Sequence, residues 1–576
     1  MILPRQLHLQ HLPMILAIGV ALIALILGAP QADSASGQTE GFLIAGQLVD
    51  PQGQPVVGAE VSAHVSSGDD PQVKAESQEN GSWSLLLPEV PEENLVISIE
   101  RHHFETQSLS LNAEDLRQLK ETGIYRVGEL TLVRKINASF WAATIIFLAV
   151  LLVIAFEKLH STTAALAGLS AVFVVTFVGG AFSPDLYIFN FERALTYINW
   201  EVIFLVMAMM IIIAIIEGTG IFQWMAFQAY RLSRGRSWLL VLILMLLTAV
   251  ASALLDNFTT MLLMTPISLQ IGLALGINPL ALIIPEVLAS NVGGISTLIG
   301  TPTNILIGAY AGIGFSDFLI NQTVGVVLAL AVMAGYALFH YRQEWRKRSG
   351  GISPKLYEIL KENARLEDPQ ALWKSGLVFL LVLIGFVVGE RYHIIPAVTA
   401  LVGATVLLIW LKPNVHAMIL AVDWTTLVFF MALFIVVGAV QEVGLIGFIA
   451  AGMSRLVGEN LVLATFVIVF GAGTLSTTIA NIPLTASMLP VVEFLTGSIP
   501  GANSRVLYYA LSMGAAMGGN GLLIGGEANL VTAGITDQAG SPISFGEFLK
   551  VGLPVTYLTL AVGFLWLLFR FVILGN

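Results

Sequence analysis

The chain has 576 residues, of which 56% are hydrophobic and only 11% are charged, and its formal net charge is −11. Soluble globular proteins carry about 25% charged residues, so the composition excludes an ordinary soluble enzyme and indicates a membrane protein. The excess acid lies between residues 31 and 135, which hold 17 acidic and 7 basic side chains. No basic surface for nucleic acid is therefore expected. The absence of cysteine excludes disulfides and thiolate metal sites.

The first 36 residues have the order of a secretory signal. Arg5 is followed by an apolar run over residues 12–28 and then by small and polar residues. This order predicts a signal peptide or an uncleaved signal anchor. The segment that follows, residues 37–135, is therefore expected outside the cytoplasm.

Residues 37–135 predict a small β-sandwich, because short alternating stretches are separated by turn signals such as Asp50-Pro51-Gln52-Gly53. The pattern GQLVDPQGQPVVGAEV, followed by ENGSWSLLLP, resembles the carboxypeptidase-regulatory-like (transthyretin-like) domains. That resemblance implies an accessory domain and names no ligand. Strands are expected at 42–49, 59–65, 82–87, 95–100 and 127–133.

From residue 138 onward the chain is a series of apolar segments, which predicts a polytopic α-helical membrane protein. The polar stretch 342–375 is rich in Lys and Arg and is expected to be a cytoplasmic loop of a plasma (inner) membrane protein. It separates a first transmembrane region, 136–341, from a second, 376–576. Spans are expected at 138–156, 160–182, 200–217, 237–255, 257–275, 279–314, 321–341, 376–389, 394–411, 424–441, 461–476, 481–497, 504–534 and 551–574.

The two transmembrane regions contain an internal repeat. Apolar residues often match by chance when two apolar segments are aligned, whereas several matches of Trp, Gly, Asn and Pro at one fixed offset are not expected by chance. The matched pairs, all with the same separation in the chain, are Trp200 and Trp424, Gly220 and Gly444, Asn257 and Asn481, and Pro266 and Pro490. Asn304 and Asn529 continue the match with one extra residue.

Each repeat is broken at two places by Gly, Pro, Asn and Thr within apolar sequence. Unwound backbone cannot face lipid, so these breaks are expected to line an enclosed polar cavity. Paired interruptions in two homologous halves are typical of a transporter's central site. Segments 237–275 and 461–497 are long enough for re-entrant hairpins. Counting them as hairpins leaves five crossings per half, which makes the two repeats inverted.

The motifs LLDNFTTMLLMTPI, SNVGGISTLIGTPTNILIG, NIPLTASMLP and GGNGLLIGGEANLVTAGI resemble the P-protein branch of the ArsB/NhaD ion transporter superfamily, which is related to the divalent anion/sodium symporters. The resemblance covers residues 190–570. It implies a secondary transporter with two half-sites for substrate and coupling ion, with Na⁺ near Asn257 and Asn481. The residues of these half-sites are Asp256, Asn257, Thr259, Thr260, Asn291, Gly293, Gly294, Ser296, Thr297, Gly300, Thr301, Thr303, Asn304, Asn481, Pro483, Thr485, Gly519, Asn520, Gly525, Glu527 and Asn529.

The sequence departs from the family's pattern in its acids. The first loop reads Gly300-Thr301-Pro302-Thr303-Asn304 where the family often has G-D-P-P-N, and Glu527 adds a carboxylate to the second loop. Intramembrane acids are costly and functional by default, so Asp256 and Glu527 are expected to serve coupling, with helix capping and loop support as the alternatives.

Three further acids have less certain roles on sequence grounds. Glu286 follows Pro285 inside an interrupted span, where it is either a proton relay or a partner for a polar neighbour. Glu217 and Glu442 stand beside glycine at span ends and are expected to be solvated or to lie at the membrane interface.

The leading hypothesis is a secondary active carrier of a small anion or oxyacid coupled to Na⁺ or H⁺. Arsenite or silicic-acid efflux and Na⁺/H⁺ antiport are alternatives within that class. An anion channel and a membrane-anchored sensor are alternatives outside it. No enzyme motif, transition-metal site or cofactor is expected beyond the coupling ion. The expected partners are the lipid bilayer, the small ion substrate and, by analogy, a second copy of the chain.

Overall fold

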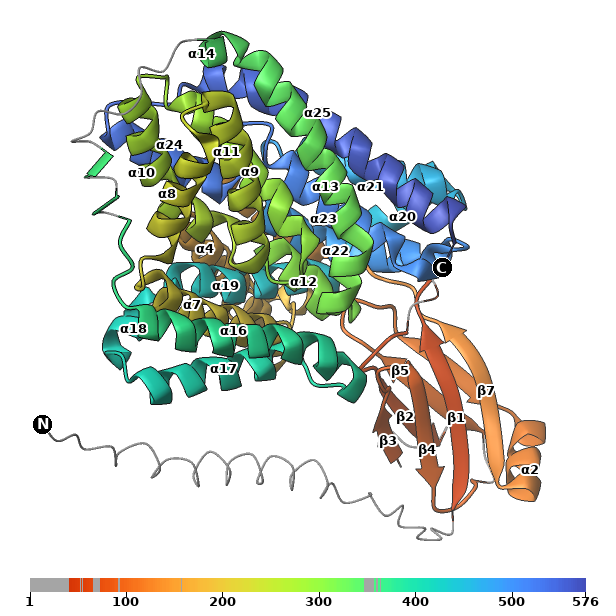
Figure 1. Cartoon of the computed structure of the whole chain (residues 1–576). Coiled ribbons are helices and arrows are strands. Elements are labelled where there is room, and N and C mark those ends of the chain that lie inside the picture. Colours follow the sequence, from red (N-terminus) through yellow and green to blue (C-terminus); the bar gives the residue numbers. More distant parts are fainter. Residues whose placement is uncertain are drawn as a thin grey trace, which may run out of the picture. The chain divides into compact units, whose positions relative to one another are not determined.

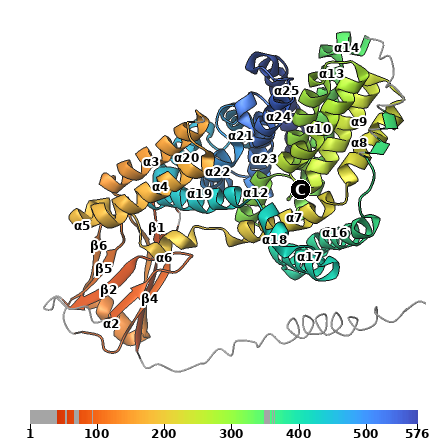
Figure 2. The same ribbon diagram turned by 90° about the vertical axis from the view of Figure 1, so that its left-hand side faces the viewer.

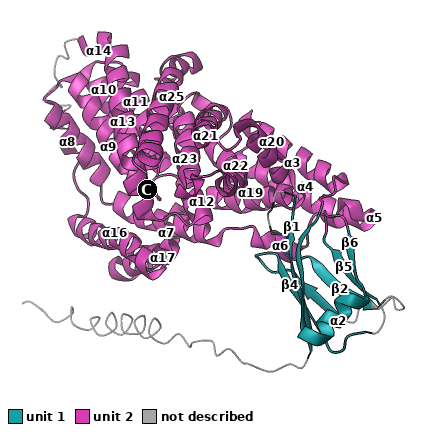
Figure 3. Cartoon of the chain, turned by 90° about the vertical axis from the view of Figure 1, so that its right-hand side faces the viewer, with its two compact units in different colours: residues 1–101, 106–132 teal, residues 102–105, 133–576 magenta. Residues whose placement is uncertain are grey.

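The computed structural model describes residues 41–51, 53, 55–65, 73–91, 94–156, 158–346, 357–358, 361–362 and 364–575. It divides the chain into two compact units (Figure 3). The first comprises Met1–Arg101 and Thr106–Leu132, and the second His102–Glu105 and Val133–Asn576. The predicted signal segment, residues 1–36, lies outside the described residues.

The first unit holds two β-sheets, in the strand orders β4-β1-β7 and β3-β2-β5-β6. Alternate side chains face inward, so that Trp83, Leu85 and Leu87 of β4 are buried while the residues between them are not. The predicted strands correspond to β1, β2, β4, β5 and β7. The elements are β1 Phe42–Val49, β2 Glu60–Val65, β3 Val73–Glu76, β4 Ser82–Leu87, β5 Leu95–Glu100, β6 Gln107–Leu111, α2 Ala113–Thr122 and β7 Ile124–Thr131.

The second unit is helical, and nine helices within its described residues are long and apolar enough to cross a membrane (Figure 1). The helices before and within the first repeat are α3 Ala138–Ala155, α4 Ser161–Phe173, α5 Gly180–Phe182, α6 Phe191–Thr196, α7 Trp200–Glu217, α8 Ile221–Ser233, α9 Ser237–Leu254, α10 Asn257–Leu275, α11 Leu280–Gly293, α12 Pro302–Ala311, α13 Phe315–His340 and α14 Arg342–Arg346. Those that follow are α16 Pro369–Gly389, α17 Pro396–Leu411, α18 Val415–Ala421, α19 Trp424–Glu442, α20 Leu445–Val457, α21 Leu461–Leu475, α22 Asn481–Ser498, α23 Val506–Gly518, α24 Glu527–Gln538 and α25 Phe545–Leu567.

The repeat inferred from the sequence is present in the helices. The starts of α7, α8, α9 and α10 precede those of α19, α20, α21 and α22 by one constant offset, the same offset that relates the matched residues. Gly220 and Gly444 precede α8 and α20 with φ values of 78° and 93°, a left-handed conformation that glycine adopts at little cost. Pro266 and Pro490 lie inside α10 and α22. The two halves therefore share local geometry as well as residue types.

Each half is preceded by a helical pair that packs on the other half. Helices α3 and α4 contact α19, the first helix of the second repeat (Figure 2). Helices α16 and α17 contact α7, the first helix of the first repeat. On α3 the side chains of Trp141, Ile145, Leu148 and Leu152 are exposed at helical spacing, as expected of a face in contact with lipid.

Several predicted boundaries were wrong. Helix α13 begins at Phe315 and α16 at Pro369, so both start earlier than expected and the polar loop is shorter than 342–375. Pro369 follows the capping Asp368, whose carboxylate accepts hydrogen bonds from the Gln370 and Ala371 N–H groups. Helix α16 therefore begins within the polar sequence, several residues before the apolar segment that was predicted to span the membrane.

Candidate functional site

The first helical hairpin is formed by α9 and α10, which are joined only by Leu255 and Asp256. Asp256 is the N-cap of α10, and its Oδ1 accepts a hydrogen bond of 2.7 Å from the Thr259 N–H. Thr260, on the same first turn, is fully buried, and its hydroxyl has no partner among the described residues. The capping alternative for Asp256 is therefore part of its role.

The second hairpin, α21 and α22, has a different tip. Ala480 occupies the N-cap position of α22, and its side chain cannot accept a capping hydrogen bond. Asn481, Pro483 and Thr485 lie buried on the first turn of α22, and the Thr485 hydroxyl has no partner among the described residues. The two hairpins share a fold, but only the first has a carboxylate at its tip.

The unwound loops between α11 and α12 and between α23 and α24 are each held by one asparagine amide. Asn304 Nδ2 donates to the carbonyls of Ile295 and Thr297, at 3.0 and 2.7 Å. Asn529 Nδ2 donates in the same way to Gly519 and Leu522, at 2.8 and 3.1 Å. Backbone carbonyls that lack helical partners are thus satisfied from within the protein.

Glycine is required where these loops meet the hairpins. A Cβ on Gly293 would lie 2.4 Å from the Ala249 carbonyl oxygen, and one on Gly518 would lie 2.3 Å from that of Gly473. Both are helical glycines at the ends of α11 and α23. The close approach joins each hairpin to its own loop, so a hairpin and a loop form one packed half-site.

Asparagine side chains connect the two half-sites. Asn257 Nδ2 donates to Asn291 Oδ1 at 2.7 Å. Asn291 Nδ2 in turn donates to Asn520 Oδ1 at 2.8 Å and to Asn529 Oδ1 at 3.1 Å. These four residues, the asparagine network, are all at most 6% exposed. Asn481, the repeat equivalent of Asn257, makes no hydrogen bond to the network among the described residues.

The other predicted residues support the loops. Ser296 and Thr297 hydroxyls donate to the carbonyls of Gly293 and Ala253, and Thr301 caps α12 by accepting a hydrogen bond of 3.2 Å from the Asn304 N–H. Gly294 and Ser296 lie in the short helix η3 (Gly294–Ser296), and Thr297, Gly300 and Thr301 lie in the connection to α12. Thr303 and Asn304 lie in the first turn of α12. In the second half, Gly519 and Asn520 follow α23, Gly525 ends the short helix η6 (Leu523–Gly525), and Glu527 and Asn529 lie in the first turn of α24.

A cavity of about 160 Å³ lies beside the network, and four acids line it. Asp256 and Glu527 come from opposite repeats, and Asp423 and Glu217 come from α19 and α7. No Lys, Arg or His is among the described lining residues. A neighbouring cavity of about 720 Å³ shares Asp423 and Glu527. We call the smaller space the acidic cavity.

Helix N-termini converge on the acidic cavity. Asp256 caps α10, Asp423 caps α19, and Glu527 is the first residue of α24. Each carboxylate occupies a position that the helix dipole makes favourable for negative charge. Helix α12 also begins at the cavity, with Pro302, and its N-terminus carries no acid.

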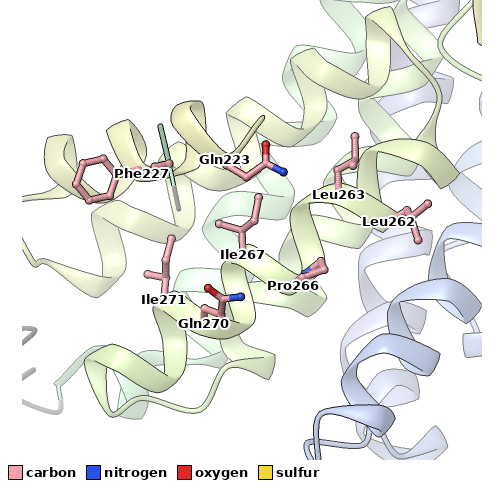
Figure 4. Close-up of a pocket in the computed structure, with 9 residues that line it drawn as sticks. Gln223, Phe227, Leu262, Leu263, Pro266, Ile267, Gln270 and Ile271 are labelled. Atoms are coloured by element: carbon pink, nitrogen blue, oxygen red, sulfur yellow. The ribbon is translucent and has the colours of Figure 1, made fainter. Parts of the chain in front are cut away.

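A further cavity of about 240 Å³ lies between α8 and α10 and shares Leu262 with the acidic cavity (Figure 4). Helix α8 contributes Gln223 and Phe227, and α10 contributes a mainly apolar wall that includes Pro266 and Gln270. No charged residue is among its described lining. Its composition does not suit an ion.

Sequence reasoning missed Asp423, Ser512 and Gln322. Asp423 matches Asn199 in the repeat, which marks its position in the chain but not its place at the cavity. Ser512 Oγ donates to Asn304 Oδ1 at 2.6 Å, and Gln322 Nε2 donates to Ser512 Oγ at 3.0 Å. Both lie inside ordinary apolar helices, where no local signal marks them.

Of the two environments predicted for Glu442, solvent and the membrane interface, solvent is wrong. The residue is 9% exposed, and its side chain accepts a hydrogen bond from the Tyr197 hydroxyl and lies 3.5 Å from Arg193. Helix α6 provides Arg193 and the segment after it provides Tyr197. Helix α6 and the segment after it pack on the end of α19 and replace the solvent that a span end would otherwise meet.

Comparisons with known proteins identify a family of transporters. The family model described as "CitMHS: Citrate transporter" matches residues 151–504. The chain is 36% identical over 438 residues to the uncharacterized transporter Rv2684 of Mycobacterium tuberculosis, covering 75% of this chain and 99% of that protein. It is 31% identical over 575 residues to the P protein of Homo sapiens, covering 86% of this chain and 67% of that protein. Among solved structures, the YdaH transporter of Alcanivorax borkumensis matches with a TM-score of 0.48 and 15% identity, over 71% of this chain and 98% of that chain.

Proposed function

Because the chain belongs to the citrate transporter family and is a membrane transporter rather than an enzyme, we propose that it is a secondary active carrier. It moves a small anion or oxyacid together with Na⁺ or H⁺ by alternating access of two inverted repeats across the plasma membrane. The observation that carries this proposal is the acidic cavity, where Asp256 and Glu527 of opposite repeats meet beside the asparagine network.

The charges of the cavity support a cation or proton as the coupling ion. Neighbouring carboxylates repel one another unless a cation or a proton lies between them. No basic side chain is among the described lining residues to neutralise them. Hard cations such as Na⁺ prefer oxygen ligands, which the carboxylates of Asp256, Asp423 and Glu527 provide.

The anion requires a different part of the site. Carboxylates already occupy the N-termini of α10, α19 and α24, whereas the N-terminus of α12 is free of acid and borders the same cavity. The positive end of a helix dipole attracts an anion. The anion is therefore assigned to the Pro302 end of the cavity, with the cation nearer the acids.

Flux into proteoliposomes tests the proposal. Labelled citrate, smaller carboxylates, phosphate, arsenite and silicic acid are supplied in turn under a Na⁺ gradient, a pH gradient or neither. The expected result is gradient-driven uptake of one substrate, which Asp256→Asn abolishes and which Glu459→Gln, at an exposed residue outside the helices, leaves intact. Absence of flux for every ion under every gradient would refute a carrier.

Na⁺/H⁺ antiport is the second candidate, and it is favoured by the four acids and the lack of Lys, Arg and His among the described residues that line the acidic cavity. In that case the cavity alternates between Na⁺ and protons, and α12 binds no anion. Sodium flux against a pH gradient in liposomes without any carboxylate or oxyacid separates the two functions.

A further inference from the structure

Glu286 of α11 is an acid enclosed within the membrane unit and is not among the residues that line the acidic cavity. Its side chain has no exposed surface. Its Oε2 accepts a hydrogen bond of 2.8 Å from the Ser268 hydroxyl of α10. Its Oε1 is buried and has no partner among the described residues. Half of this carboxyl group therefore has no hydrogen bond.

No counterion reaches Glu286 from the described helices packed on α11. Helices α9 and α10 carry no charged side chain. None of the titratable groups on the other packed helices forms an ion pair with it in the described structure. Those groups are Asp317, Tyr336 and His340 on α13, Tyr508 and Tyr509 on α23, Glu527 and Asp537 on α24, and Glu547, Lys550 and Tyr557 on α25.

An ionised carboxylate at this position would be costly. Burying an unpaired charge costs several kcal/mol in practice, whereas a protonated acid buries only a polar group. A single serine hydroxyl does not offset that cost, and one carboxyl group with one hydroxyl is too few ligands for a metal cation. The chemical species that fits the position is a proton.

The second repeat shows that the fold does not require this acid. The Ser252–Ser290 and Ser476–Ala515 hydrogen bonds are equivalent contacts in the two halves, and aligning α11 with α23 on them places Leu511 at the position of Glu286. Aligning α10 with α22 on their first residues places Val492 at the position of Ser268. Leu511 and Val492 are both fully buried. The same helix contact is thus apolar in one half and ionisable in the other.

The helices that hold Glu286 and its partner Ser268 also carry members of the asparagine network. Asn291 follows Glu286 by five residues on α11, which is roughly 7.5 Å along the helix axis. Thr265, one turn before Ser268 on α10, lies 3.4 Å from the Thr532 hydroxyl of α24. Helix α24 also carries Asn529 of the network. Glu286 therefore shares α11 with Asn291, and its partner Ser268 shares α10 with Asn257.

We propose that Glu286 is a proton-binding site of the transport cycle, separate from the acidic cavity. The proton resides on the unpaired Oε1 while α10 packs against α11, and it leaves to water when movement of the first hairpin exposes the carboxyl group. Ser268 positions the carboxyl group through its hydroxyl. This inference rests on the proposed carrier function and identifies H⁺ as one of its coupling ions.

Infrared spectroscopy tests the proton directly, without any transport. The purified full chain is titrated in H₂O and D₂O, and the C=O stretch of a protonated carboxyl group is followed. The expected result is a band at neutral pH that disappears in Glu286→Gln and persists in Asp256→Asn. A band that is unchanged in Glu286→Gln would overturn the proposal.

Transport measurements test the coupling. Glutamine copies the shape of a protonated glutamate but cannot release a proton, so Glu286→Gln should fold. Its pH-driven uptake should fall about tenfold or more, because a gradient of one pH unit changes the occupancy of an unsaturated proton site about tenfold. Exchange of substrate without a gradient should remain. Ser268→Ala should shift the pH profile of uptake without abolishing it.

The double variant Glu286→Leu/Ser268→Val reproduces the Leu511 and Val492 pair of the second repeat. It allows the coupling to be tested even if Glu286→Gln disturbs folding. Replacing a buried polar pair by packed apolar residues is often neutral for stability, so this variant should fold and be uncoupled from pH. Retained pH-driven uptake in either variant would overturn the coupling role, even if the infrared band is lost. A wild-type chain that moves no substrate would instead refute the carrier function, and the infrared result would still decide whether Glu286 holds a proton.

Discussion

Asn291 of the first repeat donates a hydrogen bond of 2.8 Å to Asn520 of the second, so the two halves of the protein meet through side-chain amides. Asn291 is 2% exposed and also bonds Asn257 and Asn529. Buried polar networks of this kind are specific because every member must be satisfied. The contact fixes how one half-site is placed against the other.

Replacing Asn291 with Ala should destabilise the protein by about 2–3 kcal/mol, because it leaves the buried amides of Asn257, Asn520 and Asn529 short of partners. Thermal unfolding of the purified full chain measures the effect. Asn503→Ala is the matched control, since Asn503 is exposed in the connection before α23 and should change stability by under about 0.5 kcal/mol. Equal melting temperatures for the two variants would contradict the role of the network.

Sodium should stabilise the wild-type protein against heat more than an equal concentration of choline does, if Na⁺ binds in the acidic cavity. A ligand at about 100 times its Kd adds about 2.7 kcal/mol to the folded state. Asp256→Asn keeps the cap of α10, because Asn is also a favourable N-cap, so it should fold and lose the Na⁺ effect. Glu527→Ala should lose it as well. Stabilisation that is unchanged in both variants would contradict the assignment of the cavity.

Gly293→Ala and Gly518→Ala should each destabilise the protein by about 1–3 kcal/mol, because the added methyl group would overlap a backbone carbonyl oxygen that cannot move aside easily. Gly335→Ala and Gly376→Ala are the controls. Both glycines lie inside helices with open space where the added methyl group would lie, so alanine should be neutral or stabilise by about 0.5–1 kcal/mol. Chemical or thermal unfolding of the four variants compares them directly.

Glu442→Ala should destabilise the protein by about 2 kcal/mol or more, because it leaves Tyr197 and the partly buried Arg193 without their acceptor. Glu217→Ala is the comparison at the equivalent end of α7. Glu217 is only partly buried and has no ion pair among the described residues, so its loss should cost less. A larger melting-temperature change for Glu217→Ala than for Glu442→Ala would contradict this ranking.

The apolar helices could be predicted because length and hydropathy alone determine a span. The constant offset between matched residues then identified equivalent helices before any contact was known. Helix α8 was missed because Gln223, Gln228 and Arg231 interrupt its apolar face over only 13 residues. Helix α20 also has only 13 residues, which is too short for a predicted span, and it was missed as well. Strand β3, with four residues, is too short to show an alternation.

The candidate site could be predicted in part. Gly, Pro, Asn and Thr within apolar runs indicated the breaks, and the structure places Asn257, Asn291, Asn520 and Asn529 within hydrogen-bond distance of one another. Asn291 contacts both Asn520 and Asn529, whereas Asn481 does not join them in the described structure. These contacts depend on packing between elements of opposite repeats, which are far apart in the chain. No local pattern contains that information. Whether these residues bind an ion stays a prediction.

Three buried acids, two at the acidic cavity and one outside it, have no acidic equivalents in the other repeat. Asp256, Glu286 and Glu527 correspond to Ala480, Leu511 and Pro302. In a carrier with inverted repeats, each half adopts in the inward-open state the conformation that the other half has in the outward-open state. If the two halves were identical, these two states would have equal free energy. Here the acids stand at different positions in the two halves, so the empty protein should favour one orientation and a membrane voltage should alter that preference. The side of the membrane on which substrate is first captured would then depend on where each half carries its acids.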